Sequence, residues 1–239
     1  MKDSSQNKER QFGVVTFLDV LGWKGVYDRQ ADAIASLKLL VDGVGKRATG
    51  KRGRINGDVI VKSISDTIAI FTACDDTEVS KAIEIHGELC QWLIPESIRS
   101  ALPVRGATAY GAFEISDNIF VGKAVDEAAS WHEQGNWIGV NLSPSAEFVF
   151  SKSSSTSAWV PYSAPIKTAM KWQPHCVNWL LEWTDISREK DAVCAKFRSM
   201  GPIVPEFAPK FINTLSFIEE MTKLSSSLPP SPSPSANSL

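Results

Sequence analysis

Two aspartates that end strand-like runs are the residues of this sequence best placed to do chemistry. Residues 14–18 form a mostly apolar run, typical of a buried strand, that ends at Asp19 and is soon followed by Gly22. Residues 59–71 hold two apolar runs on either side of Asp66, which predicts an antiparallel hairpin with Asp66 at its tip. If the first strand pairs with this hairpin, the two carboxylates meet at one edge of a sheet.

Paired carboxylates repel each other unless a cation lies between them. Gly22 lets the backbone approach a ligand, and we expect a helix to follow it and point its N–H groups at an anion. This combination indicates Mg²⁺ or Mn²⁺ together with a nucleoside triphosphate. The alternative is that Asp19 and Asp66 are two separate turn or helix-capping residues, the commoner role of a lone aspartate after a strand.

The apolar periodicity of the rest of the chain predicts the elements that position these residues. One helix is expected to begin at Thr77 as its N-cap and to be limited by Pro95. The element order predicts an α+β sandwich with a mixed, mainly antiparallel sheet covered by helices. The further helices are expected over residues 28–44, 122–134, 187–199 and 206–224, and the further strands over residues 104–113, 137–142, 158–162 and 175–183.

Composition sets the broad class of the protein. The chain has 239 residues, 43% of them hydrophobic, and a net charge of −2, which suits a globular protein and gives no nucleic-acid signal. No apolar run is long enough for a bilayer, and the polar N-terminus lacks a signal-peptide core, so we expect a cytoplasmic protein without a membrane partner. The expected organisation is a polar N-terminus, a main domain, a pair of C-terminal helices and a disordered Ser/Pro tail, over residues 1–11, 12–185, 186–224 and 225–239.

Several polar features have more than one interpretation. The basic, glycine-containing residues 46–54 are either a solvated loop, which we favour, or a flexible cationic lid over a triphosphate. His86 and His175 are interpreted as structural or surface residues. The apolar stripe of the last helix is expected to pack either on the main domain or on a partner subunit.

Four segments together are similar to those of class III nucleotide cyclases. Residues 17–23 (FLDVLGW) resemble the first metal-binding segment of that family, and residues 61–66 (VKSISD) resemble the second, with Ser65 where many members have glycine. Residues 104–111 (VRGATAYG) resemble the following central strand, and residues 120–128 (FVGKAVDEA) the helix that completes the site. The sequence resembles in particular the pyrimidine cyclases of the Pycsar anti-phage systems, which share the Leu-Gly after the first aspartate and the Arg-Gly-Ala strand.

The resemblance implies a ferredoxin-type sandwich that cyclises a nucleoside triphosphate with release of pyrophosphate. In such a site Asp19 and Asp66 hold two divalent ions, Mn or Mg, with the carbonyl of Val20 as an extra ligand. The β and γ phosphates are expected on the N–H groups of Leu21, Gly22 and Trp23.

The chain departs from the family pattern in the helix after Gly122. Where many members have Asn and Arg there, this sequence has Asp126 and Ser130. Either another cation replaces the arginine or the chain is inactive. Among the candidate cations, Arg105 is preferred to Lys123 and Lys167 because an arginine fork suits phosphate. The alternative role of Arg105 is an internal ion pair with a helix carboxylate.

The expected substrate follows from the positions that match the purine-recognising residues of the family. Ile60 and Ile119 stand there, and two isoleucines offer no donor or acceptor to a purine edge. We therefore predict a pocket for a pyrimidine triphosphate, with UTP preferred to CTP, and with Asp126 near the ribose.

The resemblance also implies a head-to-tail homodimer in which each site takes its metal half from one chain and its base and ribose half from the other. Arg105 is expected to act from the second half. The cyclic product would activate a separate effector protein during phage infection. Two alternatives remain, a catalytically inactive nucleotide-binding dimer and a scaffold dimer without nucleotide.

Overall fold

The computed structural model describes residues 11–150, 157–168, 170, 172–181, 183–200 and 204–227. The polar N-terminus expected over residues 1–11 and the tail expected over residues 225–239 therefore lie outside the described residues, apart from Gln11 and residues 225–227.

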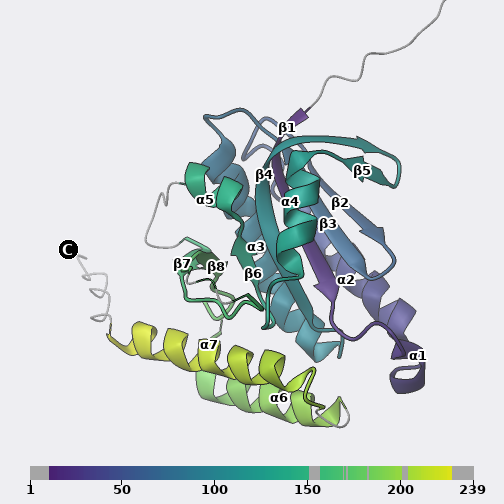
Figure 1. Cartoon of the computed structure of the whole chain (residues 1–239), viewed down its shortest axis with the longest axis vertical. Coiled ribbons are helices and arrows are strands. Elements are labelled where there is room, and N and C mark those ends of the chain that lie inside the picture. The colour runs from purple at the N-terminus through teal and green to yellow at the C-terminus, as the bar shows by residue number, and fades with distance from the viewer. Residues whose placement is uncertain are drawn as a thin grey trace, which may run out of the picture.

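The chain forms a mixed eight-stranded sheet in the order β2-β3-β1-β4-β6-β8-β7, with β5 paired to β4 (Figure 1). All neighbouring strands run antiparallel except β4 and β6, which are parallel. The predicted α+β class, with a mixed and mainly antiparallel sheet, is confirmed. The strands are β1 (Gln11–Val20), β2 (Val59–Ile64), β3 (Thr67–Ala73), β4 (Val104–Ser116), β5 (Ile119–Val121), β6 (Val140–Leu142), β7 (Trp159–Pro161) and β8 (His175–Val177).

Helices cover both faces of the sheet (Figure 1). Helix α4 packs on one face, α2 and α3 pack on the other, and α6 and α7 lie side by side at one end of the molecule. No helix in the described part of the chain is long and apolar enough to cross a membrane. The helices are α1 (Val26–Arg29), α2 (Ala33–Thr49), α3 (Val79–Arg99), α4 (Lys123–His132), α5 (Pro144–Val149), α6 (Ile186–Ser199) and α7 (Ala208–Ser227).

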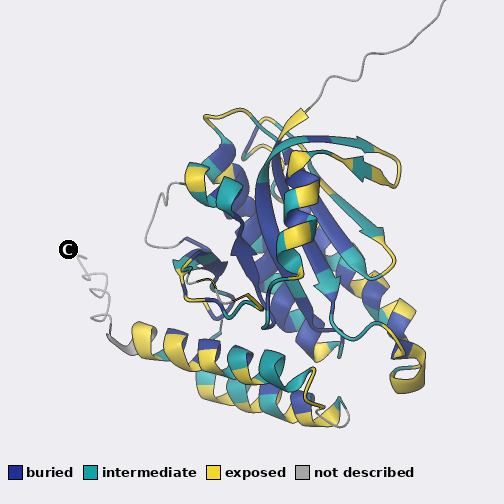
Figure 2. Cartoon of the chain, in the orientation of Figure 1, coloured by how far each residue is buried: buried dark blue, intermediate teal, exposed yellow. Residues whose placement is uncertain are grey.

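Strand β1 is buried on both faces, and its side chains alternate between the two helix layers. Val14 and Leu18 belong to the large core on the α2 and α3 side, whereas Val15 and Phe17 belong to the smaller core under α4. Because side chains in a strand alternate with period two, Asp19 faces the same side as Phe17, toward α4. Figure 2 shows the resulting buried sheet between half-exposed helices.

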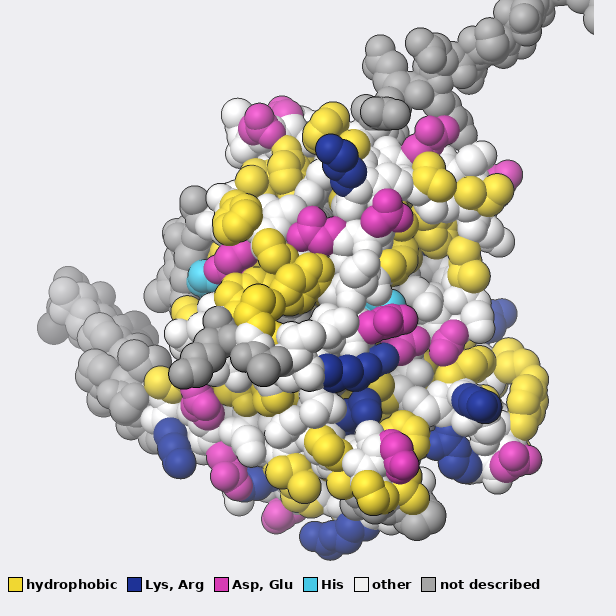
Figure 3. Space-filling model, viewed as in Figure 1, with side chains coloured by type: hydrophobic (Ala, Val, Ile, Leu, Met, Phe, Trp, Pro, Cys, Tyr) yellow, Lys and Arg dark blue, Asp and Glu magenta, His cyan; other side chains and the backbone are white. Residues whose placement is uncertain are grey.

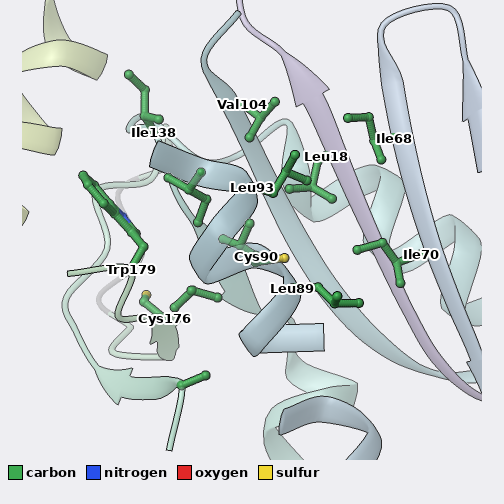
Figure 4. Close-up of a cluster of buried hydrophobic side chains, with 14 of the residues drawn as sticks. Leu18, Ile68, Ile70, Leu89, Cys90, Leu93, Val104, Ile138, Cys176 and Trp179 are labelled. Carbon is green, nitrogen blue, oxygen red and sulfur yellow. The ribbon is translucent and has the colours of Figure 1, made fainter. Parts of the chain in front are cut away.

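The large core joins the sheet to α3 and to the loops near the C-terminal helices (Figure 4). Leu18, Leu93 and Val104 lie close together in this cluster, and Trp179 lies on the side of α3 away from the strands. Ile68 from β3 belongs to the same cluster, so the predicted hairpin is anchored on this side.

Helix α7 is docked on its own chain through Phe217, which is fully buried. The Phe217 ring stacks on Trp179 at 5.7 Å between centroids and lies 4.9 Å from Trp137. The hydroxyl of Thr214 accepts a hydrogen bond of 2.9 Å from the N–H of Ile138. Of the two expected partners for the last helix, the structure therefore shows the main domain of the same chain.

The basic segment is not a lid, because it is held against α3. Helix α2 continues to Thr49, five residues beyond the predicted end, so part of the segment is helical. Beyond α2, Lys51 donates to Glu88 at 2.5 Å. Arg54 donates to the same carboxylate through both of its terminal nitrogens, with Nη2 at 2.8 Å. These ion pairs tether the segment to the body of the protein.

Helix α3 also departs from the prediction at both ends. It runs through Pro95 to Arg99, because Ile94, Pro95 and Ile98 are all buried and their packing outweighs the backbone hydrogen bond that proline removes. At its start, the expected N-cap Thr77 is not the capping residue. Instead the carboxylate of Asp75 accepts from the N–H groups of Thr77, at 2.9 Å, and of the next residue, at 3.1 Å.

Candidate active site

Asp19 lies at the end of β1, where it is the cross-strand partner of Arg105 on β4. The Nη2 group of Arg105 donates to Oδ2 of Asp19 at 3.4 Å, a long hydrogen bond. The side chain of Asp19 is 20% exposed and that of Arg105 is 12% exposed. The carboxylate of Asp19 therefore lies at the end of β1, largely buried and held by a long hydrogen bond.

The structure brings Asp66 to the same end of the sheet. Asp66 lies in the tight turn between β2 and β3, and its carbonyl accepts a 3.1 Å hydrogen bond from the N–H of Val20. Burial raises the pKa of Asp19, and the charge of Asp66 raises it further, while His132 and Arg105 act in the opposite direction. The predicted acid pair is thus within electrostatic reach, and its two carboxylates repel.

Arg105 is fixed by a helix end as well as by Asp19. Its Nη1 group donates to the carbonyl of Glu133 at 3.0 Å and to that of Gly135 at 3.2 Å, just beyond the end of α4. The expectation that Arg105 acts from the second half of a shared site is wrong, because it contacts Asp19 of its own chain. Arg105 does form an internal ion pair, but with Asp19 of β1 and not with a helix carboxylate, the partner that the alternative interpretation expects.

His132, which sequence reasoning missed, is the last residue of α4 and lies near Asp19. In its protonated form it lowers the pKa of Asp19, as Arg105 does. Its buried Nδ1 atom has no hydrogen-bond partner among the described residues. The available signal was that Asp19 faces α4, whose C-terminal turn carries this histidine.

The loop after β1 differs from the phosphate-binding turn expected from the sequence. The next helix, α1, starts only at Val26 and is four residues long, so no long helix points its N-terminus at the site. The N–H of Leu21 already donates to the carbonyl of Pro103 at 2.8 Å. The N–H groups of Gly22 and Trp23 form no hydrogen bond with any residue that the structure describes, which leaves them open to a ligand.

The side chain of Arg29 binds the backbone of the loop after β1. Its guanidinium donates to the carbonyl of Gly22 and to that of Gly25, the latter at 3.4 Å. Both glycines have a left-handed backbone, with φ of 75° and 76°, which a glycine adopts without strain. A side-chain cation therefore sets the shape of the loop that carries the open N–H groups.

Lys167 adds a second cation beside Arg105. Its backbone N–H donates to the carbonyl of Gln134 at 2.9 Å, which anchors the loop before β8 next to the end of α4. Burial lowers the pKa of Lys167, and the neighbouring charge of Arg105 lowers it further, while Glu133 and Asp19 oppose this shift. Figure 3 shows Lys and Arg side chains next to acidic ones in the middle of one face of the molecule.

The predicted base and ribose residues lie apart from Asp19 within one chain. Ile60 on β2 is 38% exposed, and Ile119 on β5 is 68% exposed. Asp126 is exposed near the start of α4, six residues before His132, which is about 9 Å along a helix axis. The base and ribose residues are thus at the surface, but within one chain they lie apart from the acid pair.

The oxygen donors at Asp19 and Asp66 suit a hard divalent cation, since Mg²⁺ is commonly held by one or two carboxylates together with waters and substrate phosphates. Among the described residues no group of three or more His, Cys, Asp or Glu side chains is placed to hold a metal ion. The repelling acid pair therefore fits a site that substrate oxygens complete. Asp19, Asp66 and the carbonyl of Val20 are the donors the chain offers.

No protein-family model matches the sequence, and no curated protein matches it. Several solved structures resemble it. A bacterial light-regulated adenylyl cyclase has 13% identity and a TM-score of 0.45, over 80% of this chain and 60% of that one. A class III adenylyl cyclase-like ATP-binding protein from Pseudomonas aeruginosa has 14% identity and a TM-score of 0.41, over 60% of this chain and 35% of that one. The chain thus spans less than two thirds of the length of either.

The guanylyl cyclase Cya2 has 11% identity and a TM-score of 0.46, over 71% of this chain and 91% of that one. The catalytic core of a rhodopsin-guanylyl cyclase with converted specificity, in complex with ATPαS, has 18% identity and the same TM-score of 0.46. It covers 71% of this chain and 96% of that one.

Proposed function

We propose that this protein is a nucleotide cyclase that converts a pyrimidine nucleoside triphosphate, UTP in preference to CTP, into the 3′,5′-cyclic monophosphate and pyrophosphate. The observation that carries the proposal is the repelling pair of Asp19 and Asp66 at one end of the sheet, bordered by cations. A catalytically inactive protein has no need to keep two carboxylates that repel each other. A polyphosphate with bound divalent ions relieves this repulsion.

The reaction is an internal phosphoryl transfer. The 3′ oxygen of the ribose attacks the α phosphorus, its proton is lost to a base, and the bond from the α phosphorus to the bridging oxygen of pyrophosphate breaks. Bound divalent ions would lower the pKa of the attacking hydroxyl and offset the charge of the phosphates. Asp19 and Asp66 would hold those ions, and the N–H groups of Gly22 and Trp23 would bind phosphate oxygens.

The cations of the chain have a part of their own in this scheme. Arg105 pairs with Asp19, and the charges of both residues act on Lys167, so these two cations border the acid pair where a leaving pyrophosphate would gain negative charge. Fixed donors aimed at developing charge stabilise a transition state more than mobile ones do, and Arg105 is fixed by the carbonyls of Glu133 and Gly135. Arg105 is therefore the favoured replacement for the arginine that is missing at Ser130.

The base preference rests on Ile60 and Ile119. Both are exposed on strands, as residues of a pocket formed between two chains should be in a single chain. Their side chains give a purine edge no hydrogen-bonding partner, and their bulk favours a single-ring base. Asp126 would contact the ribose from the second chain of a homodimer.

The resemblance to the Pycsar pyrimidine cyclases supports the biological role that we propose. The cyclic pyrimidine nucleotide would act as a second messenger that activates a separate effector protein in defence against phage. The division of the chain into a cyclase domain at residues 12–185 and C-terminal helices at residues 186–224 belongs to the same proposal.

One observation favours a second candidate, a catalytically inactive dimer that binds nucleotide and signals through protein contacts. The guanidinium of Arg105 is already engaged by Asp19 and by two carbonyls, so it has fewer free donors for a phosphate. In that case the chain would bind a nucleoside triphosphate without turning it over.

The test is to incubate the purified chain with each of the four ribonucleoside triphosphates and Mn²⁺, and to quantify cyclic product. We expect UTP to be cyclised fastest. Asp19→Asn and Asp66→Asn should each abolish product while the melting temperature stays near that of the wild type. Asp58→Asn, which alters an exposed carboxylate paired with Arg52, is the matched control and should remain active.

Three results would count against the proposal. Faster turnover of ATP or GTP would refute the pyrimidine pocket. Near-normal activity of either site variant would refute the metal role of the acid pair. Tight nucleotide binding without any product would favour the second candidate.

A further inference from the structure

A cavity of about 690 Å³ lies next to the acid pair of the candidate active site and shares the loop after β1 with that site. Its walls come from the loop after β1, from the turn between α3 and β4, and from α6 and α7. Leu21 and Gly22 line it, but Asp19, Asp66 and Arg105 do not. Its size is in the range of pockets that hold small organic molecules. The cavity thus shares one wall with the candidate active site.

The charges around this cavity are all of one sign. Four cations line it and no carboxylate does; the cations are Lys24, Arg29, Lys196 and Lys210. None of the four forms an ion pair with a carboxylate in the described ranges of the chain. Because no carboxylate lines the cavity beside them, these cations favour an anionic ligand.

Lys210 links the cavity to the cations of the candidate active site. Its Nζ group donates to the carbonyl of Glu206 at 2.7 Å and lies 5.3 Å from the centroid of the Phe207 ring. Burial lowers the pKa of Lys210, and the charges of Arg105 and Lys167 lower it further. Glu206 opposes this shift, and Lys210 is thus within electrostatic reach of both cations beside Asp19.

The remaining walls are largely apolar, which restricts the kind of anion that fits. Two aromatic rings of α7 and its preceding turn face aliphatic side chains from three other segments. These apolar lining residues are Phe207, Phe211, Val26, Leu102, Pro103 and Met200. An inorganic anion would leave these apolar walls exposed to water, whereas a molecule with an apolar body would bury them.

We propose that this cavity binds an organic phosphate, a phosphate monoester carried on an aromatic or aliphatic body. The cations would bind the dianionic group, and the apolar walls would hold the body.

Occupancy of the cavity would also bear on the loop after β1. The N–H of Leu21 donates to Pro103 at 2.8 Å, and the side chain of Gln30 donates to the carbonyl of Ser100 at 3.1 Å. A ligand spanning α7 and this loop would therefore restrain Gly22 and its N–H group. Any consequence for turnover rests on the proposed function, whereas binding itself does not.

The test is calorimetric titration of the full chain, in the presence of EDTA, with 1-naphthyl phosphate as the probe. Inorganic phosphate and 1-naphthol, the two halves of the probe, are titrated separately. We expect the probe to bind at least about tenfold more tightly than either half, because both parts of the cavity contribute. Equal affinity for probe and either half, or no binding at millimolar concentration, would overturn the proposal.

Variants place the binding in this cavity. The double variant Lys196→Gln/Lys210→Gln and the single variant Val204→Glu, which puts a carboxylate on the cavity wall, should each weaken binding by about tenfold or more. The matched control Lys190→Gln changes a lysine of α6 that pairs with Glu219 outside the cavity, and should bind as the wild type does. Wild-type affinity in both cavity variants would refute the assignment.

A last variant separates this site from the candidate active site. Asp19→Asn/Asp66→Asn should bind the probe at least as tightly as the wild type does, because neither residue lines the cavity. Loss of binding in this variant would place the probe at the acid pair and overturn the proposal. Since the readout is binding without metal, it stands whether or not the chain turns over nucleotides.

Discussion

At the scale of single residues, the candidate site depends on one cross-strand register. The pairing of β1 with β4 sets Arg105 opposite Asp19, and the pairing of β1 with β3 sets the turn at Asp66 beside them. Among the described residues, Arg105 alone donates to the Asp19 carboxylate, through one long hydrogen bond, so most lone pairs of that carboxylate remain open. A slip of one residue in either pairing would turn these side chains to the opposite face.

Arg105 offers a test of whether a structural ion pair also acts in catalysis. We expect Arg105→Gln to lower turnover by about 100-fold or more, because a fixed cation beside the leaving group is lost. The turnover of Arg105→Lys should lie between that of the wild type and that of Arg105→Gln, since lysine keeps the charge and loses the fork that binds two carbonyls. Steady-state kinetics and thermal melts together decide the role. Reduced stability with unchanged turnover in Arg105→Gln would show that the residue is only structural.

The acid pair could be predicted from sequence because both aspartates end short, strongly patterned runs, and hairpin pairing is local. His132 and Lys210 could not be found in the same way. Their proximity to Asp19 or Arg105 depends on where the end of α4 and the start of α7 pack, which no local pattern specifies. Likewise, the partners of Arg105 follow from tertiary placement of two backbone carbonyls.

At the scale of elements, a buried polar network ties three strands to α3. Nδ1 of His86 lies 2.7 Å from the hydroxyl of Thr16, and its Nε2 lies 2.9 Å from that of Thr72. The Thr16 hydroxyl also lies 2.7 Å from that of Thr108. Each strand next to α3 in the centre of the sheet thus contributes one hydroxyl, and a misregistered strand would leave a buried polar group unpaired.

This network predicts a pH dependence of stability. Complete burial lowers the pKa of His86 to about 3, well below its ordinary value of 6.5. Below pH 6.5 the unfolded chain binds a proton that the folded chain does not, so the contribution of this group to stability is complete above that pH and declines toward pH 3. The expected slope is about 1.4 kcal/mol per pH unit.

The measurement is urea unfolding of the wild type and of His86→Gln between pH 7 and pH 4. The free energy of unfolding of the wild type should fall more steeply with decreasing pH than that of the variant. Parallel pH profiles would show that His86 does not remain neutral in the folded protein.

The docking of α7 predicts a second effect on stability. Phe217→Ala should lower the free energy of unfolding by about 3–5 kcal/mol, because it empties the centre of an aromatic cluster. Ile212→Ala, on the exposed side of the same helix, is the matched control and should have little effect, since Ile212 is 61% exposed. Chemical denaturation measures both. A small loss in Phe217→Ala would mean that α7 detaches easily in solution.

Local sequence rules located most elements and misjudged where several of them end, including β8, which ends at Val177 and not at residue 183. Helix α2 passes Gly45 and continues to Thr49 because Val44 and Ala48, on either side of that glycine, are buried in the large core. Helix α3 passes Pro95 because the residues around it are buried in the large core. In both cases tertiary packing outweighs the local cost of glycine or proline.

At the scale of the whole molecule, one chain holds the two predicted parts of a site at different places. The acid pair lies at the C-terminal end of α4, whereas Asp126 is exposed near its start and Ile119 is exposed on β5. A head-to-tail homodimer would bring the acid pair of one chain to Asp126 and Ile119 of the other. Exposed apolar residues on β5, Ile119 and Val121, are the surface that such a dimer would cover.

Mixing inactive variants tests this arrangement. Asp66→Asn and Asp126→Ala alter different halves, so half of the randomly mixed dimers would carry both lesions in one site and none in the other. An equal mixture should therefore recover about a quarter of wild-type turnover. Asp66→Asn mixed with Arg105→Gln should recover none, because Arg105 contacts Asp19 and both changes alter the same half. Equal recovery in the two mixtures, or an active monomer by light scattering, would contradict the shared site.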